Sequence, residues 1–600
     1  MKQKKKWLSR LAICLGVLSL LGAAGSGMAN IANADEQKIS GNPVSDNTSV
    51  RSITIWKYEI NSSTELGERG DGINTDPGKA PDLGGKKLMK DVNFEIIKIE
   101  AIGNASLIDP LKQVEGKDWE VNTSFAAIKG KTDKDGKLTF NVGTGKAADG
   151  IYLVREIKDS TSGDYTYTDE NGETKKINKP MDPFFVHLPQ TKRDDTGKLI
   201  YDVHVYPKNI ITDTKLDKTI EGGKGYSIKA GNDFQWEATT KLPDGLYNKI
   251  DKEMTITNWL DPEDGLHKDL VIDPSRLPFE LFANYFKVKD SLDERLLLKD
   301  VEVYVLDEKQ ENPIKLTNGT EYEVTLGGTK VIDPNKVEDL TEGSKKEVEV
   351  SLTDVGMKKV TLEKNPYLQV VYKVTTNKDF NGTISNKYDV NYLLPGQDPV
   401  TETSEESPEY YDGGFDIEKT DEGSKVLKGA EFHIATSKEN ADLKTYLASD
   451  GKSYKLNEDG STTPELPKDV YFVTATSDEH GKAEFNGLAL NWFTDTDGDG
   501  KQDPSNPAEK TWDKDKIEKK YWVVETKAPS GYELIKDPKE VTVTLGSADD
   551  TNIELTIVNK KKTDLPFTGG TGTMLIIIIA IGAITIGTAA IAIDKKRRAV

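Results

Sequence analysis

The sequence is poor in the residues that most extracellular cross-links and metal sites use. Cys14 is the one cysteine among 600 residues, so a disulfide within the chain and a thiolate metal site are both excluded. Five histidines without an HExxH motif or a paired spacing leave little for zinc-dependent hydrolysis. Basic residues are also outnumbered, 80 against 101 acidic ones, and a net charge of −21 argues against a nucleic-acid partner.

Long helical periodicity is scarce, whereas short β-rich runs alternate with turns rich in glycine, aspartate, asparagine and proline. Residues 137–142 and 151–156 are runs of strand length, and Asp135-Gly136 before the first is a turn signal. Strands at this spacing predict an all-β fold of tandem immunoglobulin-like β-sandwiches. Because 600 residues exceed one hydrophobic core, we place domains at residues 35–209, 210–411 and 412–562.

The N-terminus has the pattern of a secretory signal peptide. Lysines at positions 2 and 4–6 precede an apolar run from Leu11 to Leu21, and small residues lead to Ala32-Asn33-Ala34. A membrane anchor is the alternative, but this apolar run is too short to span a bilayer. We therefore expect residues 1–34 to be removed on secretion, which leaves a mature chain without cysteine.

The C-terminus, residues 563–600, contains the pentapeptide Leu565-Pro566-Phe567-Thr568-Gly569, an apolar run from Met574 to Ile593 and a basic tail. The run is long enough to span a membrane, and a basic tail stays inside. The arrangement resembles the LPxTG-type sorting signal of Gram-positive surface proteins. That resemblance implies cleavage by a sortase between Thr568 and Gly569, with covalent attachment to the cell wall. An ordinary single-pass anchor is the alternative.

Three polar side chains of the last domain fall on strand faces that otherwise point into the core. Alternate residues of a strand share one face, so Lys419 shares a face with Phe415 and Ile417. By the same parity, Glu525 and Asn559 each follow apolar residues at period two. An isolated buried lysine or glutamate costs several kcal/mol unless it is paired or neutralised. For any one residue, a lysine that reaches solvent from a strand end is the alternative.

Together the three side chains can avoid the cost of isolated burial by reacting with one another. A desolvated lysine loses its proton and becomes a nucleophile, while a buried glutamate gains a proton and polarises a carboxamide. Attack on the asparagine side chain would expel ammonia and leave a Lys–Asn isopeptide bond. Such a bond would tie the first strand of the domain to its last and supply the cross-link that cysteine does not.

The string from Tyr521 to Tyr532, together with Gly429-Ala430-Glu431-Phe432, resembles the CnaB-type domain of Gram-positive surface proteins, and the string itself resembles the E-box of pilins. The resemblance implies that Lys419 and Asn559 are bonded and that Glu525 promotes the reaction. The first domain repeats the scheme: parity places Lys57, Glu156 and Asn209 on inward faces and forms a second candidate set.

The tetrapeptide Tyr206-Pro207-Lys208-Asn209 matches the YPKN motif of shaft pilins. Lys208 points outward by parity, and the resemblance implies that its amine attacks the threonyl–sortase intermediate of the next subunit. Lys208 would then be joined to Thr568 of a neighbour. An unremarkable exposed lysine is the alternative.

The middle domain resembles the CnaA-like domain of major pilins more loosely. Lys218 and Asn386 share inward faces with apolar neighbours and form the third candidate pair. The promoting acid of that family is an aspartate after a strand. In the matching string Asn258 takes the acid position, so we expect Asp261 to serve instead.

Two smaller signals remain. Asp495, Asp497, Asp499 and Asp503 have the spacing of a calcium loop, with Gly500 at the turn. A bound Ca²⁺ and a merely acidic turn are both open, and no cofactor is required. Arg69-Gly70-Asp71 spells an integrin-type tripeptide, which can also arise by chance.

The sequence is interpreted as the major, shaft-forming pilin of a sortase-assembled Gram-positive pilus, a structural protein that supports adhesion and is not an enzyme. The expected partners are a class C sortase, identical subunits, minor pilins and, through a housekeeping sortase, peptidoglycan; the host ligand is left open. A wall-anchored monomeric adhesin of the collagen-binding type is the alternative. A hydrolase with β-accessory domains is a second rival, but no segment is left to house its catalytic domain.

Overall fold

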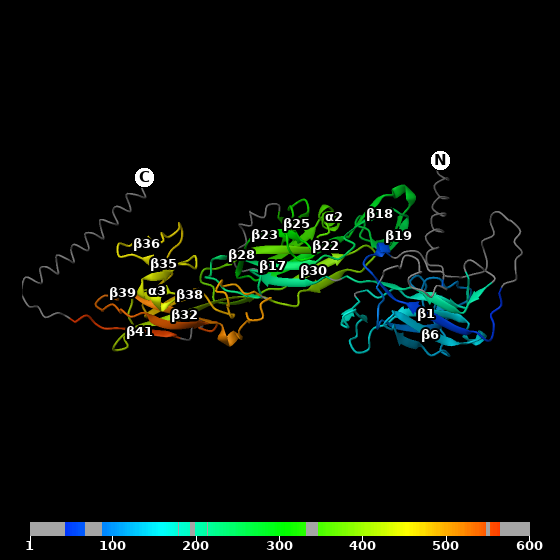
Figure 1. The fold of residues 1–600 in the computed structure, drawn as a ribbon, viewed down its shortest axis with the longest axis horizontal. Helices are drawn as coiled ribbons and strands as arrows, with labels where there is room; N and C mark the ends of the chain where they lie inside the picture. The colour runs from blue at the N-terminus through cyan, green and yellow to red at the C-terminus, as the bar shows by residue number, and fades with distance from the viewer. Residues whose placement is uncertain are drawn as a thin grey trace, which may run out of the picture.

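The computed structural model describes residues 43–65, 72, 87–177, 179–192, 198–212, 214–331, 346–503, 505–547 and 553–563. The predicted signal peptide, the pentapeptide at 565–569, the apolar run after it and the Arg-Gly-Asp tripeptide lie outside these residues. No helix in the described part of the chain is long and apolar enough to cross a membrane. The described chain is almost entirely β-structure, arranged as three successive sandwich domains along the long axis of the molecule (Figure 1), which confirms the predicted fold class.

The N-terminal domain packs a sheet in the order β13-β1-β6 against a sheet in the order β10-β7-β3-β4, with β5 also paired to β3. Its core comes from alternate residues of both sheets, such as Ile53 and Ile55 on one and Phe94 and Val154 on the other. The last strands run parallel to the first: β13 pairs with β1, and β14 pairs with β2. The elements are β1 (Val50–Trp56), β2 (Tyr58–Ile60), η3 (Ser63–Glu65), β3 (Asn93–Ala101), β4 (Trp119–Val121), β5 (Ile128–Lys131), β6 (Lys137–Thr144), η5 (Lys146–Ala148), β7 (Gly150–Glu156), β8 (Thr166–Thr168), β9 (Thr174–Lys176), β10 (Phe184–Leu188), β11 (Gln190–Thr191), β12 (Leu199–Ile200), β13 (Asp202–Val205) and β14 (Lys208–Ile210).

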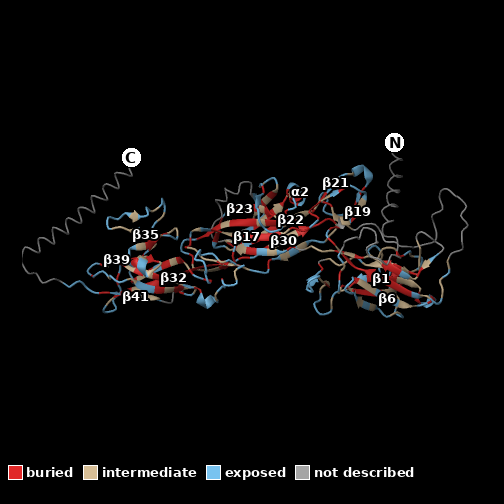
Figure 2. Ribbon diagram, in the orientation of Figure 1, coloured by how far each residue is buried: buried red, intermediate tan, exposed pale blue. Residues whose placement is uncertain are grey.

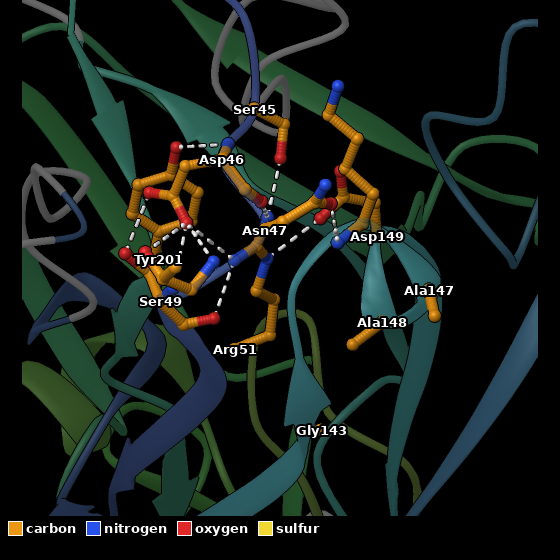
Figure 3. A network of polar contacts seen from close by, with 12 residues as sticks. Ser45, Asp46, Asn47, Ser49, Arg51, Gly143, Ala147, Ala148, Asp149 and Tyr201 are labelled. Carbon is orange, nitrogen blue, oxygen red and sulfur yellow. Dashed lines mark hydrogen bonds and ion pairs between the residues drawn. The ribbon is translucent and has the colours of Figure 1, made fainter.

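A buried arginine holds the chain that leads into β1 (Figure 3). The Arg51 guanidinium is fully buried, donates from Nε to Asp149 Oδ1 at 2.8 Å, and donates to the main-chain oxygens of Ser49 and Asp46 at 2.6 Å each. It also lies 4.4 Å from the ring centroid of Tyr201. Because β1 carries the inward residues that precede Lys57, these contacts fix the start of the strand that presents the lysine.

The middle domain packs the sheet β15-β17-β28-β23-β24 against the sheet β26-β25-β27-β22-β30-β31 around the largest core of the molecule. Two short antiparallel pairs, β18–β21 and β19–β20, form a lobe with a core of its own. The elements are β15 (Leu216–Ile220), β16 (Gly225–Tyr226), β17 (Asp233–Lys241), β18 (Tyr247–Ile250), β19 (Met254–Leu260), β20 (His267–Ile272), η6 (Pro274–Arg276), β21 (Phe279–Phe282), β22 (Tyr285–Leu292), β23 (Leu296–Leu306), β24 (Ile314–Lys315), β25 (Tyr322–Leu326), β26 (Thr329–Val331), β27 (Lys346–Leu352), α2 (Asp354–Leu362), β28 (Tyr367–Thr376), β29 (Gly382–Ser385), β30 (Tyr388–Leu393) and β31 (Val400–Thr403).

The C-terminal domain packs the sheet β37-β33-β39-β40 against β32, β38 and β41. Here too the last strand, β41, runs parallel to the first, β32. The elements are β32 (Glu409–Asp421), β33 (Glu431–Ala435), α3 (Lys438–Asp442), β34 (Thr445–Leu447), β35 (Ser453–Leu456), β36 (Thr462–Thr463), β37 (Thr474–Thr476), β38 (Lys482–Ala489), η8 (Lys514–Lys516), β39 (Glu518–Lys527), β40 (Lys539–Thr544) and β41 (Leu555–Asn559).

One strand, β32, continues from the middle domain into the C-terminal domain. Its first residues, Glu409–Asp412, pair with β29, and later residues pair with β38 and β41. The boundary placed between residues 411 and 412 therefore falls inside a continuous strand. Figure 2 shows buried residues concentrated along the strands of each sandwich, and this is where the polar side chains described next are enclosed.

Candidate functional site

The N-terminal domain encloses the side chains of Lys57, Glu156 and Asn209. Their exposed fractions are 0%, 5% and 2%. The Lys57 ammonium donates a hydrogen bond to Asn209 Oδ1 at 2.8 Å and forms an ion pair with Glu156. Asn209 Nδ2 in turn donates to Glu156 Oε2 at 3.2 Å. The amine, the carboxamide and the acid are thus in mutual contact.

Burial decides the charge state of this lysine. Desolvation lowers the pKa of Lys57, and the neighbouring Glu156 carboxylate offsets only part of that effect. The ring of Phe94 lies 5.8 Å from the Lys57 ammonium. An amine held in such surroundings is closer to its neutral, nucleophilic form than an exposed lysine is.

The C-terminal domain encloses Lys419, Glu525 and Asn559, which are 0%, 5% and 1% exposed. Asn559 Nδ2 lies 2.9 Å from both carboxylate oxygens of Glu525 and donates to them. Lys419 donates instead to the main-chain oxygens of Ile557, at 2.8 Å, and Thr420, at 3.2 Å. Burial lowers the pKa of Lys419 to about 8.

The middle domain encloses Lys218 and Asn386 beside Asp290, an acid that was not predicted from the sequence. Lys218 and Asp290 form a fully buried ion pair, and Asn386 Nδ2 donates to Asp290 Oδ2 at 3.3 Å. Burial raises the pKa of Asp290 and lowers that of Lys218, so the neutral pair is favoured over the charged one. The ring of Tyr372 lies 4.5 Å from the Lys218 ammonium.

The expectation that Asp261 serves this pair was wrong, because the structure places Asp261 elsewhere. Asp261 lies at the end of the β19–β20 hairpin, where it forms an ion pair with Lys268 and accepts the main-chain N–H of Glu263 at 2.8 Å. Asp290 belongs to β22, on which Phe286, Val288, Asp290 and Leu292 are buried and the residues between them are more exposed. The period-two argument identifies Asp290 as an inward residue of its strand, but not Lys218 as its partner.

Sheet register explains why the two outer domains place the same residue types together. Asn209 is the register partner of Glu59, two residues after Lys57, and Asn559 is the register partner of Asp421, two residues after Lys419. Across the sandwich, Glu156 and Glu525 are the register partners of Phe94 and Phe432. Parallel pairing of the first and last strands therefore brings amine and carboxamide to one level of the core.

Comparisons with known proteins agree with this architecture. Residues 49–210 match the family model for the N-terminal domain of Gram-positive pilin subunit D1, and residues 513–561 match a prealbumin-like fold domain. The chain is 25% identical to a fimbrial subunit type 2 of Actinomyces naeslundii, a match that covers 98% of this chain and 97% of the relative. It is 24% identical to a fimbrial subunit type 1 of Actinomyces viscosus over 85% of each chain.

Residues 49–210 are therefore similar to a domain of Gram-positive pilin subunits. Among solved structures, the full-length major pilin SpaD from Corynebacterium diphtheriae matches with a TM-score of 0.47 and 22% identity, over 86% of this chain and 98% of that chain. The full-length major pilin RrgB from Streptococcus pneumoniae matches with a TM-score of 0.40 and 17% identity, over 86% and 100% of the two chains.

Lys208 lies on β14, next to Asn209 of the buried site. It is the register partner of Tyr58 and is half-buried, whereas the adjacent Asn209 is buried against Lys57. Neighbours on a strand face opposite sides, so the side chains of Lys208 and Asn209 leave β14 in opposite directions. One short strand thus carries both the candidate internal and the candidate external cross-linking residue.

The acidic loop of the C-terminal domain gathers a different set of carboxylates from the predicted one. Asp495 and Asp497 lie with buried Glu509, and their oxygens come within 4.8 Å of one another. Asp499 and Asp503 are not part of that group in the described chain; they accept the main-chain N–H groups of Lys501, at 2.7 Å, and Ser505, at 2.8 Å. Calcium binding by this loop stays a prediction.

Proposed function

We propose that this major pilin is polymerised by a class C sortase, which joins Lys208 of one subunit to Thr568 of the next, and that each domain carries a Lys–Asn isopeptide bond. The contact that carries the proposal is the hydrogen bond of 2.8 Å between the Lys57 amine and the Asn209 carboxamide, beside Glu156. The similarity of the chain to pilin and fimbrial subunits supports the wider role of the protein, as a structural subunit of a cell-surface pilus rather than an enzyme.

The internal reaction needs no external reagent. Lys57 passes a proton to Glu156, because burial disfavours the ion pair relative to the neutral acid and amine. The free amine attacks the carboxamide carbon of Asn209 and forms the new C–N bond. The original C–N bond breaks, and the nitrogen leaves as ammonia after it takes a proton from the Glu156 carboxyl. The Glu156 carboxylate then accepts the extra proton of the former Lys57 amine, which leaves a neutral amide. Asp290 and Glu525 would have the same role beside Lys218 and Lys419.

The external reaction would use the same nucleophile type on an activated carbonyl. In the proposed intermediate, Thr568 is held as a thioester on the sortase cysteine. Attack by the Lys208 amine would form the amide and release the thiolate. Repetition gives a covalent fibre, and a housekeeping sortase would transfer the finished fibre to peptidoglycan; minor pilins would be joined by the same chemistry.

The direct test is a blot of cell-wall extracts from the native host, boiled in denaturant. Wild type should give a ladder of high-molecular-weight bands, and Lys208→Ala should give monomer. Lys112→Ala is a matched control, because this lysine is an exposed residue of the same domain, and it should keep the ladder.

Two outcomes would contradict the proposal in different ways. A ladder unchanged by Lys208→Ala would show that the polymer forms but that another lysine is the acceptor. A single monomer band in all strains would restore the wall-anchored monomeric adhesin, which relatives described as fimbrial subunits do not favour.

A further inference from the structure

A cavity of about 120 Å³ lies at the junction of the middle and C-terminal domains. Ser227 and Lys229 line it from the segment that follows β16 in the middle domain. Thr436, Leu447, Lys519 and Tyr521 line it from the C-terminal domain. Its wall is therefore complete only when the two domains are docked.

Two lysines line this cavity, one from each domain. Lys229 is 6% exposed, and its ammonium donates to the main-chain oxygens of Lys378, at 2.9 Å, and Ala230, at 3.3 Å. Lys519 is half-buried, with its ammonium 5.5 Å from the ring of Tyr521. Neither forms an ion pair with any carboxylate in the described residues.

Two acids act on Lys229 without forming an ion pair with it. Asp412 acts on Lys229 electrostatically, but it is fully buried and accepts the Tyr410 hydroxyl at 2.6 Å. Burial raises the pKa of Asp412 well above its ordinary value, which favours its uncharged form. Asp379 is the other acid that acts on Lys229. For Lys519, burial lowers the pKa, and no acid among the described residues opposes that effect.

We propose that this cavity binds a small oxyanion, of the size and charge of phosphate, between Lys229 and Lys519. The oxygens of such an anion would accept charge-assisted hydrogen bonds from both ammonium groups, which are stronger than bonds between neutral groups. Thr436, which also lines the cavity, accepts at Oγ1 from Asn440 Nδ2 at 3.1 Å, so its own hydroxyl proton is available to donate.

A bound anion would link the two domains and stabilise their contact. The two lysines come from different domains, and each is costly to bury as a cation without a counter-charge. The anion removes that cost only while both domains contribute their lysine. This role is separate from polymerisation, because the cavity contains none of the residues proposed to form isopeptide bonds.

Calorimetric titration of the purified mature chain with inorganic phosphate, at an ionic strength fixed with chloride, tests the proposal. The informative variant is Lys519→Gln, because Lys519 is only half-buried and is therefore tolerant of change. Lys520→Gln is the matched control: the residue is adjacent and exposed, and it pairs with Glu540 at 2.8 Å. Both substitutions remove one positive charge.

We expect saturable binding to the wild type and to Lys520→Gln, and affinity lower by about 10-fold or more in Lys519→Gln. The control also separates site binding from the general stabilisation that phosphate gives to folded proteins. Equal affinity in Lys519→Gln and wild type would overturn the proposal, as would the absence of saturable binding at phosphate concentrations in the tens of millimolar.

Discussion

The N-terminal and C-terminal domains carry the same three residue types in the same strand register, yet their lysines have different hydrogen-bond acceptors. Lys57 lies between β1 and β2 and donates to the carboxamide oxygen of Asn209. Lys419 lies inside β32 and donates to the main-chain oxygen of Ile557, its register partner. The N-terminal amine therefore already touches the group it would attack, whereas the C-terminal amine must first leave a main-chain carbonyl.

The carboxamide of the C-terminal site shows the same difference. Asn559 donates to Glu525 and to the main-chain oxygen of Glu533 at 2.9 Å, but its Oδ1 is buried and has no hydrogen-bond partner among the described residues. An unsatisfied buried acceptor costs free energy. A shift of the Lys419 amine from Ile557 to Asn559 would satisfy that oxygen and reproduce the contact of the N-terminal site.

The largest expected effect is loss of a bond when its acid is removed. Intact mass of recombinant residues 35–562 should fall short of the translated sequence by three ammonia molecules, one for each candidate site. Glu156→Ala, Asp290→Ala and Glu525→Ala should each restore one, because no group is left to accept and return the proton. Asp261→Ala should restore none, since Asp261 pairs with Lys268 instead.

Two results of the mass measurement would contradict this prediction. A deficit of three ammonia molecules in Asp290→Ala would show that the middle domain bonds without this acid. A wild-type mass equal to the translated sequence would remove the isopeptide chemistry from all three domains.

The second effect concerns stability. A bond between Lys57 and Asn209 would close a loop between residues 152 positions apart, and cross-links that close loops this long contribute about 4–5 kcal/mol in the chain-entropy model. Lys57→Met should therefore lower the unfolding temperature of the N-terminal domain in calorimetry and leave the C-terminal domain unchanged. Lys419→Met should do the reverse. An N-terminal transition that Lys57→Met leaves in place would show that this site is not bonded.

Much of this architecture follows from period-two patterns in the sequence. The strands of the outer domains, and the inward direction of Lys57, Glu156, Lys419 and Asn559, follow from alternation, because one face of each strand is buried. That alternation is local, so a single sequence can reveal it.

Asp290, the acid of the middle domain, could not be identified by comparing a short segment of this sequence with the motif of the family. Asp290 comes from a strand of the opposite sheet, and only the packing of β22 against β15 brings it to Lys218. The acceptor of Lys419 and the cavity between domains are likewise set by tertiary packing. Sequence identifies which side chains point inward, whereas the structure decides which of them meet.

The smallest effect is a pH dependence that distinguishes a bonded from an unbonded C-terminal site. In Glu525→Gln the bond should not form, and Lys419 loses a neighbour that raises its pKa, so its folded-state pKa should be about 8 or lower. The unfolded lysine titrates near 10.4. Between these values the unfolded state binds more protons, so stability should rise with pH, by about 2–3 kcal/mol in total. Denaturant unfolding from pH 7 to 10 measures this rise, and Lys419→Met in the same background should abolish it. The wild type, with its lysine amidated, should resemble the double variant; equal slopes in Glu525→Gln and the double variant would mean that Lys419 is not the titrating group.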